Sequence, residues 1–133
     1  MPKKILAIDD TDSILDLYRI LLRGKGYELT TASTGREGLE ALRAETPDLV
    51  LLDIGLPDIS GWDILRIIRR TEGNEDLPVI VATVLDEDAD VAHGWILDCT
   101  SFLSKPLDAD RLVLLVDRLL EPEEARLAST PRT

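Results

Sequence analysis

The sequence has 133 residues, 44% hydrophobic and 31% charged, a balance typical of one globular domain and not of a disordered chain. Its formal net charge of −11 argues against nucleic acid or an anionic membrane as a direct partner, because phosphate binding rests on Lys and Arg. It contains no apolar run long enough to span a membrane and no secretory signal, and its single cysteine, Cys99, cannot form an internal disulfide, so we expect a cytoplasmic protein.

The first third of the chain predicts a strand, a helix and a second strand. Residues 5–8 form a continuous apolar run, which is typical of a strand buried on both faces of a parallel sheet. Apolar residues recur on one stripe of a helix predicted at 13–23, with Asp12 placed to be its N-cap and glycines after its end. Residues 27–32 alternate more between polar and apolar side chains, so we predict an edge strand there.

The middle of the chain repeats this pattern. A second helix is predicted at 35–45 and ends before Pro47, and a second apolar run, at 49–53, predicts the third strand. Ser60, with an acidic residue three positions further on, is a capping signal for a third helix that continues through Arg70.

The last third predicts two more strands, at 79–83 and 102–105, and two more helices, at 87–97 and 108–120. Strands and helices thus alternate five times, which favours an α/β fold with a parallel sheet covered by helices on both faces. Right-handed crossovers leave few topologies for such a chain. We expect one domain over residues 1–122, followed by a flexible C-terminal tail at 123–133.

Polar side chains follow several of the predicted strands at the point where each strand ends. These residues are Asp9 and Asp10, then Asp53, Thr83 and Lys105. Sites in open α/β sheets form at the carboxyl ends of the strands, so we expect these side chains to converge. Close carboxylates repel each other unless a cation neutralises them, and Mg²⁺ takes its oxygen ligands from one or two carboxylates. The sequence therefore predicts a magnesium site.

At these residues the sequence resembles a response-regulator receiver domain, the CheY-like phosphoacceptor module of two-component signalling. The resemblance covers roughly residues 3–120. It rests on the acidic pair after the first strand, on LLDIGLPDISG at 51–61, on Thr83, and on FLSKP at 102–106. It implies a doubly wound, flavodoxin-like fold of five parallel strands in the order 2-1-3-4-5, with five helices.

The resemblance also implies a role for each residue of the acidic rim. Asp53 would be the nucleophile that accepts a phosphoryl group from a histidine kinase or a histidine phosphotransfer protein. Asp10 and Asp53 would bind Mg²⁺ directly, together with the backbone carbonyl of Gly55. Asp9 would act on the ion through water.

The remaining roles concern the opposite side of the same site. Lys105 would hold the phosphoryl oxygens, and Thr83 would donate its hydroxyl to them and shift towards them. Phe102 would swing inward when Thr83 moves and so couple phosphorylation to an outer face of the domain. The Lys105–Pro106 peptide would be cis. Such a chain is a signalling module that acts through protein contacts. It is not an enzyme beyond its own Mg²⁺-dependent phosphorylation and dephosphorylation.

Each of these residues also has a simpler structural interpretation. Asp53 could end a strand as a turn residue, and Asp9 or Asp10 could cap a helix. Thr83 could be an ordinary β-branched strand residue, and Lys105 could merely offset the acidic rim. The convergence of all of them at strand ends favours the functional interpretation; for Phe102 a plain core aromatic is an equal alternative.

The sequence departs from the family pattern at a few positions. Val84 stands where Ala or Gly is usual, and it could either narrow the route to Asp53 or pack into an apolar gap. Asp98-Cys99 stands where Gly-Ala is usual. Gly55 and Leu85 occupy the positions that tune dephosphorylation in the family, and their opposite characters leave the sign of the effect open.

Surface features and competing functions complete the interpretation. Val113 and Leu114 lie off the core stripe of the last helix and, with the fourth helix, would suit a partner or homodimer face. His93 is interpreted as a surface histidine without a phosphotransfer role.

A receiver cut from a longer regulator with an output domain is the main alternative function. A flavin-binding protein is disfavoured by the acidic DDTDS after the first strand, and an aspartyl-phosphate hydrolase by Gly55, where its second Asp would stand.

Overall fold

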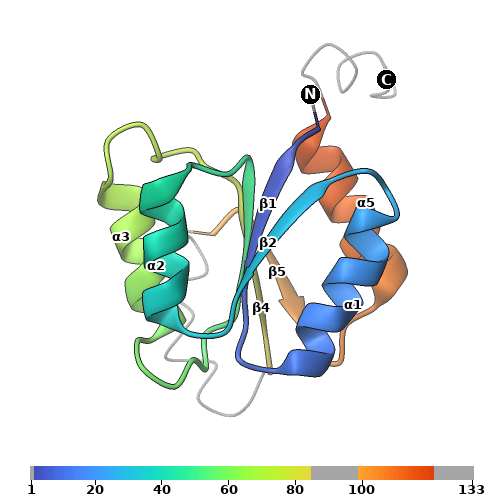
Figure 1. The fold of residues 1–133 in the computed structure, drawn as a ribbon, viewed down its shortest axis with the longest axis horizontal. Coiled ribbons are helices and arrows are strands. Elements are labelled where there is room, and N and C mark those ends of the chain that lie inside the picture. The colour runs from blue at the N-terminus through green and yellow to red at the C-terminus, as the bar shows by residue number, and fades with distance from the viewer. Residues whose placement is uncertain (1, 85–98, 122–133) are drawn as a thin grey trace, which may run out of the picture.

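The computed structural model describes residues 2–84 and 99–121. Strands and helices alternate along these ranges (Figure 1). The elements are β1 (Lys4–Ile8), α1 (Asp12–Arg23), β2 (Glu28–Ala32), α2 (Gly35–Ala44), β3 (Leu49–Leu52), α3 (Gly61–Arg70), β4 (Val79–Thr83), β5 (Ser101–Ser104) and α5 (Ala109–Leu120). The helix expected at 87–97, which includes His93, lies outside the described residues, as do Leu85 and the tail at 123–133.

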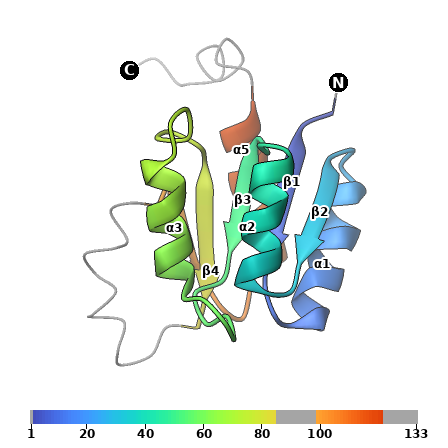
Figure 2. The same cartoon turned by 60° about the vertical axis from the view of Figure 1, so that its left-hand side comes forward.

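The strands form one parallel sheet in the order β2-β1-β3-β4-β5, which confirms the expected topology and the edge position of β2. Helices α1 and α5 pack on one face of the sheet, and α2 and α3 pack on the other (Figures 1 and 2). None of the helices within the described ranges is long and apolar enough to cross a membrane.

Two hydrophobic cores flank the sheet, and β1 contributes to both. Ile5 and Ala7 point into the core under α1 and α5, whereas Leu6 and Ile8 point into the core under α2 and α3. Successive side chains of a strand face opposite sides of its sheet. A central strand covered on both faces therefore needs a continuous apolar run, which is the pattern that identified it in the sequence.

The start of α1 differs from the sequence prediction. Asp12 is the first residue of the helix and not its N-cap; Thr11 occupies the cap position without a side-chain capping bond. The Thr11 N–H donates to Asp9 Oδ1 at 2.9 Å, and the Thr11 carbonyl accepts from the N–H groups of Ile14 and Leu15. Because Asp9 holds Thr11 in this extended conformation, the helix begins one residue before the expected start.

The other described helices begin close to where the sequence predicts. Ser60 caps α3 by accepting from the Trp62 N–H, and Asp108, expected as a helical residue, caps α5 by accepting from two N–H groups of its first turn. In α5 the buried residues are Leu112, Val116 and Leu120. Leu114 is 55% exposed, as expected for a residue off the core stripe, but the neighbouring helix of the predicted dimer face is outside the described residues.

Candidate functional site

Three polar residues follow directly on β1, β3 and β5, at the lower edge of the sheet in Figure 1. The Asp9 N–H donates to the last carbonyl of β2, the Asp53 N–H to the last carbonyl of β1, and the Lys105 N–H to the last carbonyl of β4, at 2.9–3.0 Å. Each backbone is therefore still part of the hydrogen-bond network of the sheet. This network fixes three side chains from distant parts of the sequence at one edge.

The predicted acidic cluster is present at this edge. Carboxylate oxygens of Asp9, Asp10 and Asp53 lie within 4.8 Å of one another. Asp9 is only 1% exposed and Asp53 only 6%, whereas Asp10 is exposed. Hard oxygen donors in this number are the ligand set that Mg²⁺ prefers, with water completing the coordination. The donor set therefore fits a divalent ion that is open to solvent on the Asp10 side.

Lys105 supplies a positive charge to the two buried carboxylates. Its Nζ lies 2.8 Å from Asp9 Oδ2 and 3.5 Å from Asp53 Oδ2. Burial nevertheless raises the pKa of Asp9 above its ordinary value, and the charge of Asp53 adds to this, against the hydrogen bonds from Lys105 and the Thr11 N–H. One ammonium thus compensates the cluster only in part, so the site favours a further cation.

The structure also describes the other residues that the sequence singled out. Thr83 ends β4 and is partly exposed, and the Lys105–Pro106 peptide is cis, as the resemblance implies. The Gly55 N–H donates to Asp53 Oδ1 at 3.3 Å. Val84 is 64% exposed, so it does not pack into an apolar gap among the described residues. Phe102 is half-buried against the core under α2 and α3.

The loop from Asp53 to Gly61 contains two features that the sequence reasoning missed. A Cβ at position 61 would stand 2.2 Å from the Asp53 carbonyl oxygen, so only glycine lets α3 begin this close to the end of β3. Asp58 accepts hydrogen bonds from two N–H groups at the start of α2. Its partners are more than twenty residues away, so local capping rules give no signal for this contact.

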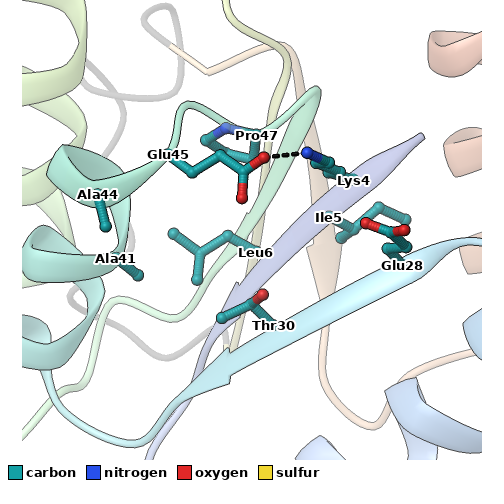
Figure 3. Close-up of a pocket in the computed structure, with 9 residues that line it drawn as sticks. All are labelled: Lys4, Ile5, Leu6, Glu28, Thr30, Ala41, Ala44, Glu45 and Pro47. Carbon is teal, nitrogen blue, oxygen red and sulfur yellow. Dashed lines mark hydrogen bonds and ion pairs between the residues drawn. The ribbon is translucent and has the colours of Figure 1, made fainter. Parts of the chain in front are cut away.

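A hollow of about 170 Å³ lies at the opposite edge of the sheet, between α2 and the strands β1 and β2 (Figure 3). Leu6 and Thr30 line its floor, and Glu28 lies at its rim. Lys4 and Glu45 form an ion pair across it. The acidic cluster is at the other ends of the strands, so this hollow does not belong to the candidate site.

Comparison with known proteins identifies the class. Residues 5–117 match the family model described as the response regulator receiver domain. The chain therefore belongs to the response-regulator receiver domains, which are the signalling domains of two-component systems. This membership confirms the resemblance found in the sequence.

Curated relatives support the assignment. The transcriptional regulatory protein AfsQ1 of Streptomyces coelicolor is 37% identical over 77% of this chain and 44% of its own length. The DNA-binding response regulator MtrA of Mycolicibacterium smegmatis is 33% identical, over 93% of this chain and 53% of the relative. The chain therefore spans about half the length of these curated relatives.

Solved structures give the same fold. A response regulator from Chloroflexus aurantiacus has a TM-score of 0.82 at 30% identity, covering 90% of this chain and 98% of the other. The chemotaxis response regulator CheY4 of Vibrio cholerae has a TM-score of 0.81 at 27% identity, covering 90% of this chain and 100% of the other. Both coverages show that the likeness extends over a whole receiver domain.

Proposed function

We propose that Asp53 accepts a phosphoryl group from the phosphohistidine of a histidine kinase or a histidine phosphotransfer protein, in a Mg²⁺-dependent reaction. The observation that carries this proposal is the convergence of Asp53 with Asp9, Asp10 and Lys105 at one edge of the sheet. The phosphorylated chain would then signal through contacts with a downstream protein. We place the protein in the cytoplasm, with the receiver domain at residues 1–122 and a tail at 123–133.

The oxygen donors of the cluster would hold the metal. Asp10, Asp53 and the Gly55 carbonyl would bind Mg²⁺ directly and Asp9 through water, and the bound ion supplies positive charge opposite the phosphoryl oxygens. Among the described residues other than its chain neighbours, no heavy atom lies within 4 Å of a Cβ built on Gly55, so packing does not enclose the Gly55 backbone on that side.

The remaining chemistry belongs to the side chains of this chain. A carboxylate oxygen of Asp53 forms a bond to phosphorus while the phosphorus–nitrogen bond of the donor breaks. The donor imidazole keeps the bonding electron pair and takes up a proton. The Lys105 ammonium, already 3.5 Å from Asp53, would bind the transferred phosphoryl oxygens, and the Thr83 hydroxyl would donate to them. Such transfer depends mainly on positioning and charge stabilisation.

The curated relatives are about twice as long as the segment that matches this chain. Because the chain spans about half of relatives that are named as transcriptional or DNA-binding regulators, we propose that it can act as the receiver part of a longer regulator with an output domain. An aspartyl-phosphate hydrolase is not favoured, because position 55 is glycine and offers no acid–base carboxylate.

The direct test is phosphorylation by a small donor. Incubation with Mg²⁺ and acetyl phosphate, followed by intact mass measurement, should give a single phosphoryl adduct that is labile and absent from Asp53→Asn. Asp48→Asn, a matched change of another aspartate next to β3, should leave the adduct in place. A wild-type protein that stays unmodified, or an adduct that persists in Asp53→Asn, would contradict the proposal.

A further inference from the structure

The loop between β3 and α3 is tied to a helix that is distant in sequence. Asp58 Oδ1 accepts a hydrogen bond from the Gly35 N–H at 2.8 Å, and Asp58 Oδ2 accepts from the Arg36 N–H at 2.9 Å. These are the first two residues of α2. A carboxylate at a helix N-terminus interacts favourably with its unpaired N–H groups and with the helix dipole. The loop is therefore fixed to α2 by a two-bond contact.

Helix α2 does not need Asp58 as its cap. Thr34 is the N-cap, and its Oγ1 accepts from the Glu37 N–H at 3.1 Å. The following N–H, of Gly38, donates to the Thr34 carbonyl. Since the helix has its own cap, the contact with Asp58 acts mainly on the loop.

The position of α2 relative to the acidic rim is closely defined. A Cβ at Gly38 would stand 2.5 Å from Ile8 Cδ1, so the helix packs directly on the last residue of β1, next to Asp9. A Cβ at Gly35 would stand 3.1 Å from Asp58 Oδ1, so glycine at this position leaves room for the carboxylate. Because α2 packs closely on β1, the contact of Asp58 with α2 fixes the loop relative to the sheet.

The segment between Asp53 and Asp58 is held on either side of Gly55, because Ile54 and Leu56 pack against the core under α2 and α3. The Ile54 carbonyl also accepts a hydrogen bond from the Gly61 N–H at 3.0 Å. A turn bond joins the Leu56 N–H to the Ile54 carbonyl, and the Gly55 N–H makes only a long bond to Asp53. No heavy atom of the described residues outside its chain neighbours lies within 4 Å of a Cβ built on Gly55. Gly55 has no side chain to pack, so the orientation of its carbonyl depends on how the residues on either side are held, and the contact of Asp58 with α2 is one of these restraints.

We propose that Asp58 is a positioning residue for the metal site: its contact with α2 holds the loop so that the Gly55 carbonyl faces the acidic cluster. The inference rests on the proposed function, in which this carbonyl is a Mg²⁺ ligand. Asp58 itself does not touch the ion. It acts through the backbone of Leu56 and Pro57, the two residues between it and Gly55.

The test compares two ways of removing an N-terminal partner from α2. In the full chain, Asp58→Ala removes the tie to the loop, whereas Thr34→Ala removes the local cap and leaves the loop contact in place. Mg²⁺ binding is measured by calorimetry and by the fluorescence of Trp62, which lies at the start of α3. We expect Asp58→Ala to weaken Mg²⁺ binding by about tenfold, the low end for loss of an outer partner of a metal site. Thr34→Ala should leave the affinity unchanged.

Two further measurements separate positioning from a loss of structure. Asp58→Asn keeps one acceptor oxygen, so its Mg²⁺ affinity should lie between those of wild type and Asp58→Ala. Amide hydrogen exchange of metal-free protein should be faster at Gly55 and Leu56 in Asp58→Ala but not in Thr34→Ala. Urea unfolding checks that both variants remain folded.

The outcomes are distinct. If wild type binds Mg²⁺ and Asp58→Ala binds it equally well, the positioning role is overturned and the proposed function stands. Equal weakening in Asp58→Ala and Thr34→Ala would also overturn it, because the effect would then come from α2 itself. If wild type does not bind Mg²⁺, the metal part of the proposed function fails first.

Discussion

Lys105 binds Asp9 more closely than it binds Asp53: its Nζ lies 2.8 Å from Asp9 Oδ2 and 3.5 Å from Asp53 Oδ2. Asp9 is almost fully buried, and burial raises its pKa. The ammonium therefore stabilises the carboxylate that is most costly to ionise. The Lys105 ammonium is also close enough to Asp53 to contact a phosphoryl group bound to that residue.

This geometry predicts opposite effects for one substitution. In Lys105→Ala the acidic cluster loses a cation that repels Mg²⁺, so Mg²⁺ affinity should rise by about tenfold, equivalent to about 1.4 kcal/mol. Phosphorylation by acetyl phosphate should slow by at least about tenfold, because a charge that stabilises the phosphoryl oxygens is gone. Calorimetry and intact mass against time measure the two effects.

Lys25→Ala is a suitable control, since it removes the same charge from a lysine that pairs with Asp117 on α5. Both properties should stay at wild-type values in this control. A simultaneous fall of Mg²⁺ affinity and phosphorylation rate in Lys105→Ala would contradict the assignment and would indicate a general loss of structure.

Asp10, the exposed carboxylate of the cluster, is proposed as a direct Mg²⁺ ligand, so its removal should abolish Mg²⁺ binding. Mg²⁺ should produce a saturable change in Trp62 fluorescence that Asp10→Ala abolishes, because a direct ligand is lost. Asp12→Ala makes the same change of charge two residues away, on the first turn of α1, and should retain the titration. A response to Mg²⁺ that survives in Asp10→Ala would remove Asp10 from the ligand set.

The sequence predicted the sheet well because its central strands β1, β3 and β4 are buried on both faces. Residues such as Ile5 and Leu6 point into different cores, so every position of the strand has to be apolar, and the run is visible without any alignment. The strand ends then placed Asp53 and Lys105 at one edge, and the backbone bonds to neighbouring strands confirm that arrangement.

The contacts that the sequence did not predict are of two kinds. Asp12 was expected as a cap because of its position before an apolar stripe, but a tertiary bond from Asp9 to the Thr11 N–H shifts the start of α1. Asp58 contacts residues that are distant in the chain. Such contacts depend on how helices sit on the sheet, and hydrophobic periodicity carries no information about a single carboxylate.

The contact of Asp58 with α2 predicts a pH dependence. Hydrogen bonds from the N–H groups of Arg36 and Gly35 lower the pKa of Asp58 in the folded protein. The unfolded chain then binds the proton more readily, so this contribution to stability is complete above the unfolded pKa of about 3.9 and is lost as the pH falls through the folded pKa. The advantage of wild type over Asp58→Asn in urea unfolding should therefore shrink on acidification below about pH 4.

Thr34→Ala provides the reference for this measurement, because it removes an uncharged cap from the same helix. Its destabilisation, about 1 kcal/mol for loss of a threonine cap, should not change with pH. If the difference between wild type and Asp58→Asn were equally constant from neutral to acid pH, the carboxylate would not be held by these N–H groups in solution.

Val84 follows Thr83 directly and exposes 64% of its surface at the edge of the sheet that carries Asp53. Its side chain is stiff at χ1, so it cannot easily swing aside for a donor, and the family usually has a smaller residue here. Val84→Ala should therefore speed phosphorylation by acetyl phosphate about threefold, less than 1 kcal/mol of barrier. Mg²⁺ affinity should not change, because the side chain contributes no ligand.

Ile20→Ala tests whether any loss of exposed apolar surface has the same effect. Ile20 is 74% exposed on α1, so Ile20→Ala removes a comparable side chain from a surface outside the acidic rim. Its phosphorylation rate should equal that of wild type. Since Val84 is not packed in the core, Val84→Ala should also leave the urea midpoint unchanged, so a faster rate reports access to Asp53 and not loosening of the fold. An unaltered rate in a folded Val84→Ala protein would show that the valine does not restrict entry of the donor.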